Sequence, residues 1–165
     1  MTRRRRPRTS HLRGLRRRRG VNTRTRRSIL LVTAVVGLYV GSWAAAVPRS
    51  FYDSFPGLGS VWVAVDGPYN EHLVRDVGAL YLGLAAASVV AAASHRVEGG
   101  RAVGVAWLVF SVPHLTYHLA HLEGFTVRDV IGQVVALSAT VVLAVPLVAP
   151  ARARSTERPT GRKTP

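Results

Sequence analysis

Residues 28–47 of the chain read SILLVTAVVGLYVGSWAAAV, a stretch of twenty residues without a charged side chain. At a rise of about 1.5 Å per residue, a helix of this length covers about 30 Å, the thickness of the hydrocarbon core of a bilayer. The stretch therefore predicts a membrane-spanning helix. Basic residues precede it and small residues end it, as in a secretory signal, but it is too long for the apolar part of a cleaved signal.

Three further apolar stretches follow in the 165-residue chain, at 77–94, 102–122 and 130–149. Each is long enough to span a bilayer. The chain combines a positive mean hydropathy of +0.16 with 23 basic residues, whereas a soluble domain would spread its charges over its whole surface. The sequence predicts an all-α, integral membrane four-helix bundle over residues 28–149.

Lysine and arginine are distributed unequally between the segments that flank the four spans. The segments before the first span, between the second and third, and after the fourth hold twenty of them, whereas the segments on the other side hold three. The positive-inside rule then places both the N- and the C-terminus in the cytoplasm. Lys163 is the single lysine, and Ala, Val and Gly are abundant, which indicates a GC-rich genome and the bacterial cell (inner) membrane.

The two ends of the chain, residues 1–27 and 150–165, are basic and lack the apolar periodicity that could form a core. We expect both to be disordered tails. The N-terminal Arg tail predicts contact with anionic lipid head groups of the bilayer, since each basic residue near such a surface contributes about 1 kcal/mol. Nucleic acid is the weaker interpretation, because no aromatic residue is interleaved with these arginines for base stacking.

The chain contains no cysteine, which excludes disulfides, thiolate zinc sites and thiol nucleophiles. It also contains no HExxH motif, Gly-rich phosphate loop or GxSxG motif. The sequence therefore offers no motif for catalysis and favours a protein that is not an enzyme.

The second stretch, 77–94, consists mainly of alanine, glycine, serine and valine, with few large side chains. Small residues let helix backbones approach closely in lipid. We expect Gly78, Gly83 and Ala87 to lie at helix contacts in the bundle centre. The alternative is that these small residues reflect composition without specific packing.

Three histidines in the third stretch, His114, His118 and His121, are spaced i, i+4, i+7 and would share one face of a helix. Ionisable residues at membrane depth usually face a bundle interior, a cavity or a partner. His114 and His121 would be about 10 Å apart along the axis, so only neighbouring pairs of these histidines could ligate one metal ion.

Further polar residues flank the second and third spans on the same predicted outer side. They are Glu71, His72, Asp76 and Glu123. Together with the histidines they could form a His/carboxylate site for zinc, iron or haem, although no cofactor is predicted outright and the metal is left open. Two alternatives are a hydrogen-bonded belt at the membrane interface, which the sequence favours, and a path for protons or a substrate.

The connection between the first two spans carries Phe51, Tyr52, Phe55 and Trp62. These aromatic residues indicate a segment in the membrane interface. At its end, Asn70 is in a position to cap the second helix.

Residues 70–85, NEHLVRDVGALYLGLA, and the Pro48-Arg49 pair that ends the first span carry a resemblance. They resemble the DoxX-like group of small bacterial four-helix membrane proteins. The resemblance implies the same four-helix topology and a packing role for the glycine-rich second helix. It implies nothing about the histidines, because residues 113–124, PHLTYHLAHLEG, are not part of the pattern.

Taken together, the sequence predicts a non-enzymatic interaction or membrane-organising component, with a homo-oligomer or another membrane protein as possible partners. A metal- or haem-binding membrane protein is one alternative. A small transporter or proton-relay subunit is the other.

Overall fold

The computed structural model describes residues 21–150 and contains five α-helices within that range. Four of them are long and apolar enough to cross a membrane, so the predicted all-α membrane fold is confirmed. Most of the two predicted tails, residues 1–20 and 151–165, lies outside the described residues. The elements are α1 (Arg24–Ala46), α2 (Pro48–Ser54), β1 (Pro56–Gly57), β2 (Ser60–Val61), α3 (Glu71–Ala93), α4 (Val97–Ala120) and α5 (Val127–Val148).

Three of the membrane helices, α1, α3 and α5, begin earlier than their apolar stretches, at polar residues whose side chains cap them. Thr23 caps α1, where its hydroxyl accepts a hydrogen bond from the backbone N–H of Arg26 at 3.3 Å. The helix α1 therefore starts at Arg24, so residues 24–27, which we expected in the N-terminal tail, belong to its first turn. Asn70 caps α3 as predicted, accepting from the N–H of Leu73 at 3.1 Å.

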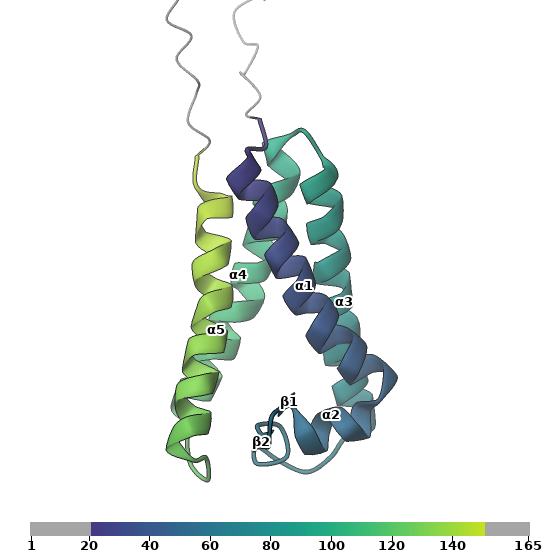
Figure 1. Cartoon of the computed structure of the whole chain (residues 1–165), viewed down its shortest axis with the longest axis vertical. Coiled ribbons are helices and arrows are strands. Elements are labelled where there is room, and N and C mark those ends of the chain that lie inside the picture. Colours follow the sequence, from purple (N-terminus) through teal and green to yellow (C-terminus); the bar gives the residue numbers. More distant parts are fainter. Residues whose placement is uncertain (1–20, 151–165) are drawn as a thin grey trace, which may run out of the picture.

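The four long helices form two antiparallel pairs, α1 with α3 and α4 with α5 (Figure 1). The two pairs approach each other at the end of the bundle where residues 21 and 150 lie, which we call the tail end. They separate toward the opposite end, the loop end, which carries α2, β1 and β2. The strands β1 and β2 pair antiparallel in a two-residue-long hairpin.

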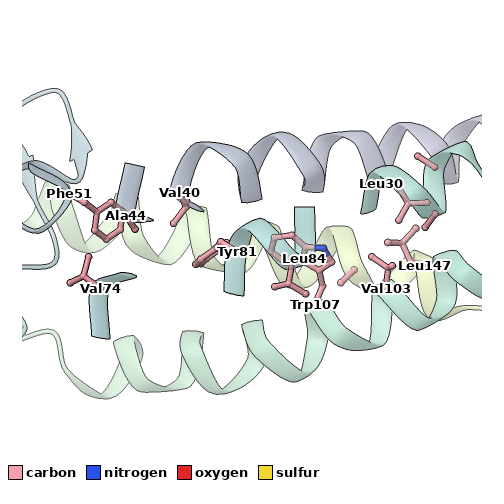
Figure 2. Packing of buried hydrophobic residues seen from close by; sticks show 13 residues of the cluster. Leu30, Val40, Ala44, Phe51, Val74, Tyr81, Leu84, Val103, Trp107 and Leu147 are labelled. Carbon is pink, nitrogen blue, oxygen red and sulfur yellow. The ribbon is translucent and has the colours of Figure 1, made fainter. Parts of the chain in front are cut away.

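A single apolar core runs along the bundle from one end to the other (Figure 2). Leu30 of α1 and Leu147 of α5 are fully buried near the tail end, and Trp107 of α4 is fully buried further along. Phe51 of α2 is buried at the loop end, beside Ala44. All four membrane helices and α2 therefore contribute to the same core.

Glycines allow α1 and α3 to approach closely. A Cβ added at Gly41 would lie 2.9 Å from the carbonyl oxygen of Gly78, and one added at Gly78 would lie 2.5 Å from the nitrogen of Ala45. Gly78 thus lies in a helix contact, but the same expectation for Gly83 and Ala87 does not hold within this chain. Gly83 faces open space and Ala87 is exposed, because they lie about 140° and 180° around the helix from Gly78.

Replacing Gly78 with alanine should destabilise the protein. The added methyl group would collide with the backbone of Ala45, and overpacking of this kind costs about 1–3 kcal/mol. Thermal unfolding in detergent, followed by circular dichroism, would measure the loss. Gly99→Ala is the matched control, because a Cβ added there would lie 4.0 Å from the nearest atom, and it should leave the midpoint almost unchanged. Equal midpoints for the two variants would contradict the packing.

Candidate functional site

A line of polar side chains runs along one face of α4 toward the loop end. Trp107 and Ser111 are buried, and the half-buried His114 and His118 follow them. The imidazole rings of His114 and His118 contact each other edge to face, with ring centroids 4.8 Å apart. The phenyl ring of Phe110 stacks on His114 with a centroid distance of 5.1 Å. The two histidines are therefore in direct contact, as their i, i+4 spacing predicted.

Gln133 of α5 lies beside His118 and is only 1% exposed. Within residues 21–150, neither the amide nitrogen nor the amide oxygen of Gln133 has a hydrogen-bond partner, and the same holds for Nδ1 of His118 and the hydroxyl of Ser111. Buried polar groups are nearly always paired, because an unpaired one costs about 1–3 kcal/mol. Unpaired polar atoms therefore gather around His118 and Gln133, and we take this α4–α5 contact as the candidate site.

The polar residues deeper in the bundle are paired. The indole N–H of Trp107 donates to the hydroxyl of Ser88 at 3.0 Å, and the hydroxyl of Ser88 donates to the carbonyl of Leu84 at 2.8 Å. Thr33 of α1 lies 3.3 Å from the same hydroxyl and donates to the carbonyl of Leu30. This group therefore connects three helices without leaving a donor unused, and it has a structural role.

His121 does not continue the line of histidines. The helix α4 ends at Ala120, and His121 follows it with φ −129° and ψ 69°. The His121 ring stacks on Tyr117 with a centroid distance of 4.1 Å, and its Nδ1 lies 2.8 Å from the Tyr117 carbonyl oxygen. The predicted i+7 position assumed a helix that continues to residue 122, whereas the chain already turns here, toward Gly124 with its φ of 82°.

The remaining predicted ligands do not join the histidines of α4. His72 pairs with Asp76 at 3.2 Å and Arg75 pairs with Glu71 at 2.9 Å, all on the exposed first turns of α3. Glu123 is exposed as well. Among residues 21–150, no three His, Asp or Glu side chains are grouped so that they could hold a metal ion. The predicted His/carboxylate cluster is thus not assembled, because its α3 members pair with their own helix neighbours.

The loop between α2 and α3 connects the two helix pairs at the loop end. The indole N–H of Trp62 donates to Asp129 of α5 at 3.0 Å, and the Trp62 ring packs against Gly132. The hydroxyl of Tyr117 donates to Asp66 at 3.4 Å. Trp62 of the loop and Tyr117 of α4 therefore anchor the loop to the α4–α5 pair, and Asp66 comes close enough to His118 to act on it electrostatically.

Gln133 is the residue of this site that was not predicted from the sequence. It is the one carboxamide in the apolar stretch 130–149, and a lone amide at membrane depth is a signal of a buried polar contact. The signal does not say which helix the amide faces, so its position beside His118 could come only from the structure.

Gln133→Leu should raise the stability of the protein, whereas Ser88→Ala should lower it. The leucine removes two unpaired polar atoms from a buried position, while the alanine leaves the Trp107 indole without its acceptor, at a cost of about 1–3 kcal/mol. Chemical unfolding in mixed micelles would measure both changes. A loss of stability in both variants would mean that the Gln133 amide is paired after all.

Comparisons of the chain with protein-family models, with curated proteins and with solved structures find no match. The resemblance of residues 70–85 to the DoxX-like group therefore stays a prediction.

Proposed function

We propose that this protein is a non-enzymatic interaction component of the bacterial cell (inner) membrane, which acts by binding a second copy of itself or another membrane protein. Both termini lie in the cytoplasm in this proposal. The basic residues of the described helices support this orientation, because those at the tail end outnumber those at the loop end. The tail-end residues are Arg24, Arg26, Arg27, Arg96 and Arg101.

The observation that carries the proposal is a second small-residue face on α3. Ala79, Gly83 and Ala87 are spaced i, i+4, i+8 and are all exposed, and a Cβ added at Gly83 would meet no atom within 4 Å. The face of α3 that packs on α1 lies on the other side and includes Gly78. Small residues at every fourth position are the pattern by which helices associate in lipid, so this face suits another helix.

Cysteine cross-linking tests the proposal directly, because the chain has no cysteine of its own. Two copies that associate through α3 place Gly83 close to its counterpart, so Gly83→Cys should form a disulfide-linked dimer on mild oxidation in membrane vesicles. Val142→Cys, on an exposed position of α5, is the matched control and should remain monomeric. Non-reducing electrophoresis would compare the two variants at equal expression.

Equal, weak cross-linking of the two variants would exclude self-association through this face. Gly83→Leu gives an independent check, since the larger side chain should separate the helices and shift the protein to monomer in detergent.

A proton-relay subunit is the second candidate, supported by the unpaired atoms around His118 and Gln133. Histidine side chains can pass protons between neighbouring groups, and polar side chains at membrane depth are costly and often mark a path for ions or protons. Asp66, which lies near His118 and accepts from Tyr117 at the loop end, would connect this site to the membrane surface.

In this second case, protein in liposomes should conduct protons, and His118→Ala should abolish most of the flux. His72→Ala is the matched control, because His72 is 86% exposed and pairs only with Asp76. A pH-sensitive dye inside the liposomes would follow the flux. Equal flux for wild type, both variants and empty liposomes would remove the relay from consideration.

A further inference from the structure

Two arginines from different helices meet at the C-terminal end of α5. Arg26 of α1 donates from Nη1 to the carbonyl of Pro146 at 2.8 Å and to that of Ala149 at 3.4 Å, and from Nη2 to the carbonyl of Leu147. Arg101 of α4 donates to the same Ala149 carbonyl at 3.5 Å. Two full positive charges therefore lie together at the tail end.

No carboxylate of the described residues neutralises these two charges. The ion pairs found between residues 21 and 150 all lie elsewhere: Arg49 with Asp53, His72 with Asp76, and Arg75 with Glu71. The carbonyl groups at a helix C-terminus amount to only about half a negative charge. The contact of α1, α4 and α5 therefore keeps an excess of positive charge.

Both guanidinium groups also keep a donor without an acceptor. Arg26 is 8% exposed, and the Nε–H groups of Arg26 and Arg101 are buried without a hydrogen-bond partner among residues 21–150. A buried donor that is left unpaired is costly, and so is the repulsion between two neighbouring positive charges. An anion with several acceptor oxygens would accept hydrogen bonds from the guanidinium groups and offset the repulsion. The arrangement is thus incomplete as it stands and suits an anionic ligand.

The position of Arg26 and Arg101 along the membrane-spanning helices indicates which kind of anion can reach them. Arg26 lies in the first turn of α1 and Arg101 in the second turn of α4, where the membrane-spanning helices begin. Val105 and Val145, which follow on α4 and α5 toward the membrane interior, are exposed. A ligand seated here meets charge at its head and apolar side chains below it, as an anionic phospholipid does.

We propose that Arg26 and Arg101 form a binding site for the phosphate group of an anionic phospholipid, held where α1, α4 and α5 meet. This site belongs to the folded bundle and is separate from the arginines of residues 1–20. It requires only that the tail end lies at the membrane surface, so it does not depend on self-association through α3 or on a proton relay.

The full-length protein in neutral detergent, titrated with phosphatidylglycerol, tests the proposal. Native mass spectrometry would count bound lipid, and phosphatidylcholine and inorganic phosphate serve as comparison ligands. We expect saturable binding of one phosphatidylglycerol, which Arg101→Gln weakens by about five-fold. Arg101→Lys should weaken it less, because the charge remains while the forked geometry is lost.

Arg96→Gln is the matched control, because Arg96 also lies at the tail end but its side chain is exposed and precedes the first turn of α4. It should bind phosphatidylglycerol as the wild type does.

Equal weakening by Arg96→Gln and Arg101→Gln would overturn the proposal in favour of general surface charge. Binding of phosphatidylcholine or of inorganic phosphate as strong as that of phosphatidylglycerol would overturn the assignment to an anionic lipid. Circular dichroism would confirm that each variant is folded, and Arg101→Lys replaces Arg101→Gln if the latter is not.

Discussion

The structure depends on how the carbonyl groups at the ends of α3 and α5 are satisfied at the tail end. The side chain of Asn22 donates to the carbonyls of Ala91 and Ser94 at 3.0 and 3.1 Å, while Arg26 donates to those at the end of α5. A single short segment before and inside α1 therefore caps two other helices. A buried polar group left unpaired costs about 1–3 kcal/mol, and these contacts are buried in the protein, so they hold the three helices together.

The contacts at the tail end also bear on the loop end, where the two helix pairs separate. The pairs α1–α3 and α4–α5 are joined at the tail end and diverge toward the loop end (Figure 1), where the connection between them is made by the loop. Trp62 reaches Asp129 on α5, and Tyr117 on α4 reaches Asp66. His118 and Gln133 belong to the α4–α5 pair, and both are buried or half-buried there.

The fold could be predicted from the sequence because the length of an apolar stretch alone determines whether a helix can cross a bilayer. The site could be predicted only in part. The contact between His114 and His118 follows from helix periodicity, but the position of His121 depends on where α4 ends, and a helix end depends on turn geometry outside the apolar stretch. The position of Gln133 beside His118 depends on how two helices are rotated about their axes, which neither hydropathy nor spacing determines.

The glycines of α3 show what helix periodicity alone can decide. Gly78 and Gly83 are five residues apart, which separates them by about 140° around a helix, so one flat contact cannot include both. The expectation that Gly78 and Gly83 share one packing face therefore combined two faces of α3 that have different surroundings. Gly78 allows α1 to approach within the chain, since even a Cβ would not fit there, while Gly83 lies where nothing in the described part of the chain approaches. A helix with small residues on opposite faces can pack tightly on two sides, and the bundle uses one of them.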